Sequence, residues 1–237
     1  MPQVVKNLLI INGLFFLATY VVQQVYHENL NQVLGMYYFE SESFRPYQLV
    51  TYMFMHGGLY HILTNMFMLW MFGSNIENVW GPKRFLTYYL ITGVGASLFH
   101  FGIDFYQVSS VMSNLTPDMI EIVKSEGANV LQQGMNYNNP DMAELNQLLN
   151  VPLVGASGAV FGILLAFGML FPNLRIIPLF FPIPIKAKYM VMFFGAFELY
   201  VAFQNSPGDN IAHFAHLGGM LFGYLLIKYW KADTPIY

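Results

Sequence analysis

The chain has 237 residues, of which 56% are hydrophobic and only 10% charged, and its mean hydropathy is positive. This is more apolar surface than one soluble core could bury, so we expect lipid to cover the excess. The absence of cysteine excludes disulfides, thiolate metal sites and a cysteine nucleophile. A formal net charge of −3, without a basic cluster, argues against nucleic-acid binding.

Six long apolar segments each predict a membrane-spanning helix. They lie at about residues 8–24, 51–72, 85–105, 152–171, 186–204 and 211–230. No small-x-small cleavage site follows the first segment, so we interpret it as an uncleaved span. No internal repeat or linker divides the chain. The expected fold is an all-α polytopic membrane protein, with residues 1–237 forming a single domain.

The basic residues predict the orientation. If the N-terminus is cytoplasmic, that side holds eight of the ten basic residues, leaving Arg45 and Lys124 outside. The eight are Lys6, Lys83, Arg84, Arg175, Lys186, Lys188, Lys228 and Lys231. The positive-inside rule then predicts that both termini are cytoplasmic.

Two connections between the expected spans are long. The first, about residues 25–50, mixes aromatic and polar residues and is expected to pack on the membrane face as amphipathic pieces. The second, about residues 106–150, is the most polar region, with short helical patterns near 117–124 and 141–149. We expect a long outer loop there that is partly disordered.

Ser157 is the candidate nucleophile. It lies between glycines at the head of an apolar segment, and the 15 residues from Ser157 to Phe171 reach roughly 22 Å as a helix. Because the hydrocarbon core is roughly 30 Å thick, a helix that starts at Ser157 places the serine below the membrane surface. Gly158 and Gly162 form a GxxxG pair, on which a second helix can pack closely.

The last span supplies a candidate base. His216, Gly219 and Gly223 lie on one helix face, so two facing GxxxG pairs would bring Ser157 and His216 within hydrogen-bond reach. A serine nucleophile needs such a histidine as general base and then as general acid. Two alternatives stay open: the glycine pairs serve packing alone, or His213, one turn away, is the base.

The second span offers hydrogen-bond donors. His61 and Asn65 are i, i+4 neighbours, and both can donate to a developing oxyanion together with the backbone N–H of Ser157. The alternative is that the two side chains make structural hydrogen bonds between helices. His56 is either a residue at the edge of the loop or a partner behind this pair.

Other chemistries find less support. The sequence around Ser157 lacks the glycine two residues later that a nucleophile elbow requires, which disfavours a soluble hydrolase. Six histidines occur without HExxH, and no carboxylate stands at ligand spacing from His61 or His216, so we expect neither a metal nor a cofactor. Glu198 either marks a proton or ion path or reaches water near the outer end of its span.

Together, these motifs resemble those of the rhomboid family of intramembrane serine proteases. They are HxxxN (His61, Asn65), GxSG (Gly155, Ser157, Gly158) and AHxxGxxxG (Ala215, His216, Gly219, Gly223). The resemblance covers about residues 45–230, and Gly73 and Glu77 are similar to that family's GxxxE. It implies a rhomboid-like bundle of six transmembrane helices. Ser157 would be the nucleophile and His216 the base of a dyad without an acidic third member, with His61, Asn65 and the Ser157 amide as oxyanion hole.

The resemblance also assigns supporting elements. The first loop would be a membrane-embedded element, the fifth span a lateral gate, and Gln204 to Asn210 a flexible cap. The sequence departs from the family pattern at Tyr47-Gln48, where many members have Trp-Arg, so the anchoring of the loop to lipid is expected to differ. It also departs at Phe161, which replaces a tyrosine that often supports the histidine; phenylalanine can stack on His216 but cannot hydrogen-bond. Activity is expected to survive that change.

The implied function is cleavage of the transmembrane segments of membrane proteins near the outer face. The expected partners are therefore transmembrane-segment substrates and the lipid bilayer, while the oligomeric state is left open. The bare six-span core is similar to the simple prokaryotic type, which implies a bacterial cytoplasmic membrane. Two alternatives remain: a non-catalytic rhomboid-like protein that binds membrane helices, and a small transporter that uses Glu198 and the histidines as a polar path.

Overall fold

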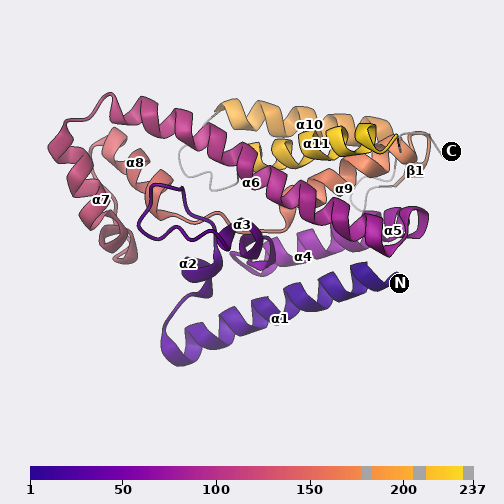
Figure 1. Ribbon diagram of the computed structural model, residues 1–237, viewed down its shortest axis with the longest axis horizontal. Coiled ribbons are helices and arrows are strands. Elements are labelled where there is room, and N and C mark those ends of the chain that lie inside the picture. Colours follow the sequence, from indigo (N-terminus) through magenta and orange to yellow (C-terminus); the bar gives the residue numbers. More distant parts are fainter. Residues whose placement is uncertain (178–182, 205–211, 232–237) are drawn as a thin grey trace.

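The computed structural model describes residues 1–177, 183–204 and 212–231, which form an elongated bundle of helices (Figure 1). The long helices are α1 (Gln3–Tyr26), α6 (Pro82–Met112), α9 (Ser157–Leu170), α10 (Ala187–Gln204) and α11 (His213–Tyr229). A further long helix consists of α4 (Leu59–Met68), a π-helical turn η2 (Leu69–Gly73) and α5 (Ser74–Trp80). α1 begins and α11 ends at the same end of the bundle.

Shorter elements connect these helices. They are α2 (Leu30–Leu34), α3 (Gln48–Thr51), η1 (Tyr52–Phe54), α7 (Pro117–Gln132) and α8 (Pro140–Asn150). Two short strands, β1 (Arg175–Ile176) and β2 (Ile185–Lys186), pair in antiparallel fashion between α9 and α10.

The centre of the bundle is α9. Ten of its fourteen residues are buried, and its sequence is apolar on every face because α6, α10, α11 and the α4–α5 helix surround it. α9 packs most closely against α11. A methyl group added at Gly219 would overlap the carbonyl group of Gly158, and one added at Gly162 would lie 3.1 Å from the Gly219 carbonyl oxygen. The two glycine pairs therefore let the backbones of these helices touch.

Two buried tyrosines join α6 to its neighbours, one to α9 and the other to η1. Tyr88 donates a hydrogen bond of 2.7 Å to the carbonyl oxygen of Gly162, and Tyr52 donates one of 2.7 Å to that of Gly93. Both rings are fully buried. Each hydroxyl thus satisfies a backbone carbonyl at a place where glycine keeps the helices close.

The outermost helix, α1, is held at its start by a remote carboxylate. Glu77 of α5 accepts hydrogen bonds from the backbone N–H groups of Val4 (2.9 Å) and Val5 (2.8 Å). These N–H groups have no partner within the helix, and the negative charge suits the positive end of its dipole. Farther along α1, Leu14 and Leu17 are 60% and 57% exposed, which is expected of a helix that faces lipid. Among the described helices, α1 and α6 are each long and apolar enough to cross a membrane, and α9 is a shorter apolar helix.

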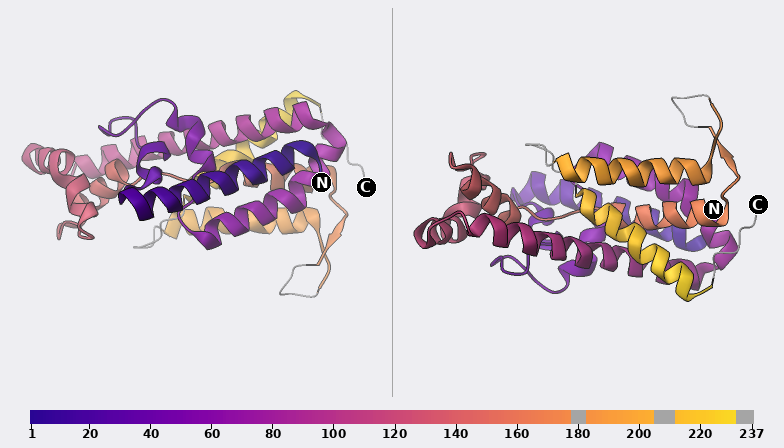
Figure 2. Two further views of the ribbon diagram at one scale, coloured as in Figure 1. Left: turned by 90° about the horizontal axis from the view of Figure 1, so that it is seen from below. Right: turned by 90° about the horizontal axis from the view of Figure 1, so that it is seen from above.

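Residues 106–150 are more ordered than the long, partly disordered loop we expected, although the short helical patterns near 117–124 and 141–149 are confirmed as parts of two helices. α6 continues to Met112, and α7 and α8 form a helical lobe at the end of the molecule away from the start of α1 (Figure 2). The side chains of Thr116 and Asn139 cap α7 and α8, and proline occupies the first position of each helix. The lobe has its own small core, made of Tyr38, Val108, Val111, Val123, Met142, Leu145 and Leu149. Caps and core together make this polar region helical.

Two helix starts also differ from the expected boundaries of the spans. Residues 51–58 form short turns, and the second long helix begins only at Leu59, after the Gly57-Gly58 pair. α9 begins at Ser157, five residues after the expected start at 152, because Gly155 has a φ of 132° that no helix contains. This late start places Ser157 in the first turn of its helix.

The first loop is organised by one buried amide. Gln48 accepts hydrogen bonds from the backbone N–H groups of Arg45 and Tyr37, and its amide nitrogen donates to the carbonyl oxygens of Val33 and Ser43. Its exposed fraction is only 1%. Glutamine thus ties the loop to itself at the position where the resemblance led us to expect arginine.

Candidate active site

Ser157 and His216 meet between α9 and α11. The Oγ of Ser157, the first residue of α9, lies 2.8 Å from Nε2 of His216, in the first turn of α11. The two side chains are adjacent because glycine brings the helix backbones together just below them. A serine hydroxyl with an imidazole nitrogen at this distance has the geometry of a nucleophile and its base.

The ring of Phe161 fixes the plane of the His216 imidazole. The two rings lie parallel, with centroids 4.2 Å apart and an interplanar angle of 6°. Phe161 is one helical turn after Ser157, so α9 supplies both the hydroxyl and the surface on which the imidazole rests.

Glu198 reaches the other nitrogen of His216. Its Oε2 lies 2.8 Å from His216 Nδ1 and 2.6 Å from His213 Nδ1, and the residue is only 7% exposed. The resemblance implied a pair without an acidic third residue, but here a carboxylate contacts the far side of the imidazole. Glu198 is also buried, whereas one of the two expectations for it was that it reaches water. An acidic residue inside a span, followed by a histidine pair at i, i+3 in the next span, was a signal for this contact. Only the packing of α10 against α11 joins the carboxylate to the histidines.

His213, the rival base, occupies a different place. Its Nδ1 is directed at Glu198, whereas the imidazole on Ser157 Oγ is that of His216. The two histidine rings lie at 84° to each other, with centroids 6.1 Å apart. The structure thus places His213 beside the carboxylate rather than beside the serine.

His61 lies against the backbone that precedes Ser157. The backbone N–H of Gly57 donates to His61 Nδ1 (3.4 Å), so the neutral ring carries its proton on Nε2. A Cβ at Gly155 would lie 2.7 Å from this Nε2 and 3.5 Å from Ser157 Oγ. Gly155 therefore needs to be glycine for two reasons: its positive φ and the imidazole next to it.

Asn65 and the start of α9 offer further hydrogen-bond donors. Asn65, one turn after His61, is buried, and its Nδ2 has no hydrogen-bond partner among the described residues. The N-terminus of α9 has no side-chain cap at Ala156, so its first backbone N–H groups are not used by a capping side chain. The geometry leaves these donors available for a negative oxygen.

His56 lies behind this group. It is 2% exposed, and the centroid of its ring is 5.1 Å from that of His61. Neither of its ring nitrogens has a partner among the residues that the structure describes. Of the two readings of His56, its burial supports a partner of His61 rather than a residue at the edge of the loop.

Glu198, His213 and His216 are also the one set of possible metal ligands among the described residues. Their ligand atoms lie within 4.8 Å of one another, and two histidines with a carboxylate form a donor set that zinc accepts. No carboxylate stands at ligand spacing from His216 in the sequence, because Glu198 comes from another helix. In the structure the same atoms are joined directly by hydrogen bonds.

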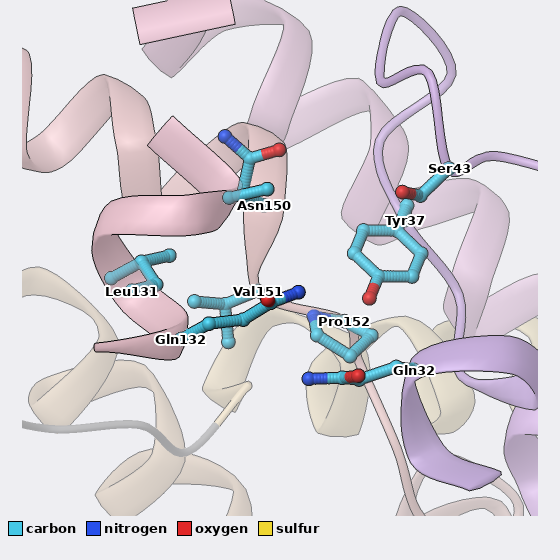
Figure 3. Close-up of a pocket in the computed structure, with 9 residues that line it drawn as sticks. Gln32, Tyr37, Ser43, Leu131, Gln132, Asn150, Val151 and Pro152 are labelled. Atoms are coloured by element: carbon cyan, nitrogen blue, oxygen red, sulfur yellow. The ribbon is translucent and has the colours of Figure 1, made fainter. Parts of the chain in front are cut away.

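A separate cavity of about 270 Å³ lies between the first loop and the α7–α8 lobe (Figure 3). Gln32 and Tyr37 line it on one side, and Leu131, Gln132 and Asn150 on the other. None of the candidate site residues lines this cavity. Its position shows that the lobe and the first loop meet at this cavity.

The fold and the site define a helical polytopic membrane protein with a serine and a histidine in contact inside the bundle. A family model for the rhomboid domain matches residues 43–231. The chain therefore belongs to the rhomboid family, which includes intramembrane serine proteases and acts on transmembrane substrates.

Curated relatives are similar over most of the chain. It is 32% identical over 218 residues to RHOMBOID-like protein 12, mitochondrial, of Arabidopsis thaliana, covering 92% of this chain and 55% of the relative. It is 27% identical over 172 residues to Rhomboid protein 1, mitochondrial, of Saccharomyces cerevisiae (73% and 38%). It is 26% identical over 193 residues to Presenilin-associated rhomboid-like protein, mitochondrial, of Mus musculus (77% and 39%). The chain thus spans 38% to 55% of the length of these relatives.

These relatives correct the expected location. From the bare six-span core and the distribution of basic residues, we expected a bacterial cytoplasmic membrane with both termini in the cytoplasm. All three relatives are named as mitochondrial proteins, which contradicts that expectation. Charge distribution separates the two faces of a membrane but does not identify the membrane.

Proposed function

We propose that this chain is an intramembrane serine endopeptidase that cleaves transmembrane segments of other membrane proteins. The observation that carries the proposal is the 2.8 Å contact between Ser157 Oγ and His216 Nε2. Membership of a family that includes such proteases supports it. The unpartnered Asn65 Nδ2 and the uncapped N-terminus of α9 also support it, since both offer donors that a negative oxygen needs.

The proposed reaction begins with attack of Ser157 Oγ on a peptide carbonyl carbon, while His216 Nε2 takes the hydroxyl proton. The carbonyl oxygen becomes an oxyanion, which accepts hydrogen bonds from His61 Nε2–H, Asn65 Nδ2 and the Ser157 amide. When the C–N bond breaks, His216 returns the proton to the leaving amine. Water then hydrolyses the acyl-enzyme, with the same imidazole as base.

The depth of the site limits the substrates. A substrate helix hides its carbonyl groups in its own hydrogen bonds, so it needs to unwind before Ser157 can attack. Helix-breaking residues near the cut bond, at the end of the bundle away from the start of α1, should therefore favour cleavage. The family resemblance adds an expected preference for a small residue before that bond. The names of the three relatives favour a mitochondrial membrane as the location.

The proposal is tested with purified protein in liposomes. A single-span reporter carries helix-breaking residues in the outer part of its transmembrane segment, and its cleavage is followed by gel and mass spectrometry. Cleavage within that segment by the parent, lost in Ser157→Ala and His216→Ala variants that keep the parent melting temperature, is the expected result. Binding of the reporter without cleavage supports the helix-binding alternative instead. Solute flux that survives Ser157→Ala supports the transporter.

A further inference from the structure

The contact between Glu198 and His216 reaches across two helices. Glu198 is on α10. Its carboxylate contacts His213 and His216, which both lie in the first turn of α11. Only four residues of α10 are buried, and Glu198 is the one polar residue among them. A charged side chain inside a membrane bundle is costly, so its partners need to compensate for the loss of water.

The geometry determines which nitrogen carries the proton. An ionised carboxylate can only accept hydrogen bonds, and its oxygens offer enough lone pairs for Oε2 to accept two. Nδ1 of His213 and Nδ1 of His216 both lie within hydrogen-bond distance of Oε2. The positive end of the α11 dipole also favours a negative charge beside its first turn. Each imidazole therefore has its proton on Nδ1 when Glu198 is ionised.

We infer that Glu198 is a positioning residue: it holds His216 in the Nδ1–H tautomer, with the bare Nε2 directed at Ser157 Oγ. This inference rests on the proposed function of Ser157 and His216. With the proton on Nε2 instead, the only lone pair of the neutral ring would be on Nδ1, which faces Glu198, and Nε2 could not take the serine proton. When Nε2 does take that proton, the imidazolium stays hydrogen-bonded to the carboxylate, which stabilises the charge without taking a proton itself. Phe161 fixes the ring plane, and Glu198 fixes the tautomer within it.

Two substitutions separate the functions of the carboxylate. Glu198→Gln keeps an acceptor of similar size but loses the charge, and Glu198→Leu removes every acceptor while keeping an apolar side chain in the bundle. Replacement of a buried charge by an apolar residue of similar volume is often neutral for stability, so we expect the Leu variant to fold. Glu77→Gln is the matched control. It changes another buried glutamate, whose oxygens accept backbone N–H groups of α1 far from Ser157 in the sequence.

The first measurement is the rate at which a fluorescent fluorophosphonate labels Ser157, together with kcat and KM for the liposome reporter. We expect labelling and kcat to fall in the order parent, Gln, Leu, with a loss of at least about tenfold for Leu and an unchanged KM. Glu77→Gln should label like the parent. If Glu198 is only a structural contact between α10 and α11, its variants change the melting temperature but label at the parent rate, and the inference is overturned.

The second measurement does not depend on activity. Nitrogen NMR of protein with labelled histidines, assigned with His216→Gln, reports which ring nitrogen carries the proton. The inference predicts a proton on Nδ1 of His216 in the parent, and a distribution over both nitrogens in Glu198→Leu. A parent His216 with its proton on Nε2 contradicts it. A parent with the predicted tautomer that fails to label supports the positioning role and instead refutes the proposed protease function.

Discussion

The packing of Gly219 against Gly158 makes a sharp prediction about Gly219→Ala. The new Cβ would overlap the Gly158 carbonyl group, whose carbon lies 2.7 Å from it, whereas ordinary contacts of a Cβ begin at 3.4 Å. Both partners are helix backbone, so α9 and α11 have to separate by about 0.7 Å or more, and such overpacking costs about 1–3 kcal/mol of stability. If Ser157 and His216 separate by the same amount, the 2.8 Å distance from Ser157 Oγ to His216 Nε2 increases to about 3.5 Å. This is longer than a good hydrogen bond.

The expected result for Gly219→Ala is a lower melting temperature and fluorophosphonate labelling that is slower by about 100-fold, because misplacement by about 1 Å has effects of that size. Gly102→Ala on α6 is the control, since a methyl group there has nothing within 4 Å. It should label like the parent. If Gly219→Ala also labels at the parent rate while folded, close backbone packing does not set the geometry of Ser157, and this reasoning fails.

Three further predictions use the same assays. Gly155→Ala should lower both the melting temperature and the labelling rate. Alanine is strained at a φ of 132° by about 1–3 kcal/mol, and its Cβ would meet His61. A melting temperature and a labelling rate equal to the parent's would contradict this prediction. Phe161→Ala should slow labelling about two- to tenfold, since a stacked ring pair contributes about 0.5–1.5 kcal/mol. A circular dichroism spectrum equal to that of the parent shows that this variant is folded. Asn65→Ala should lower kcat for the liposome reporter about 100-fold with little change in KM, as expected for one oxyanion donor; a change in KM alone would instead indicate substrate binding.

Local sequence patterns predicted much of the bundle. The apolar segments correspond to long helices because burial in lipid or in the bundle needs continuous apolar surface. The spacing of His216, Gly219 and Gly223 predicted that two helices approach closely, and the structure contains this close approach. The stacking of Phe161 on His216 also follows from a one-turn spacing after Ser157. These features depend on short-range periodicity, which a sequence displays directly.

Features that depend on tertiary packing were harder to predict. The α7–α8 lobe looked like a polar loop because its apolar residues are few, and only their meeting with Tyr38 of the first loop makes a core. Glu198 looked like an acid near water because nothing in its own helix is its partner; His213 and His216 follow 15 and 18 residues later. The flexible cap expected from Gln204 to Asn210 lies, after Gln204, outside the described residues.

The central claim, that Ser157 is a nucleophile activated by His216, has one direct test. The detergent-solubilised protein is treated with a fluorescent fluorophosphonate beside Ser157→Ala and His216→Ala variants of unchanged melting temperature, with an active serine enzyme in the same detergent as a positive control. We predict labelling of the parent at Ser157, identified by mass spectrometry, and loss of labelling in both variants. An unlabelled parent beside a labelled control enzyme, or a His216→Ala variant that labels like the parent, would contradict the claim.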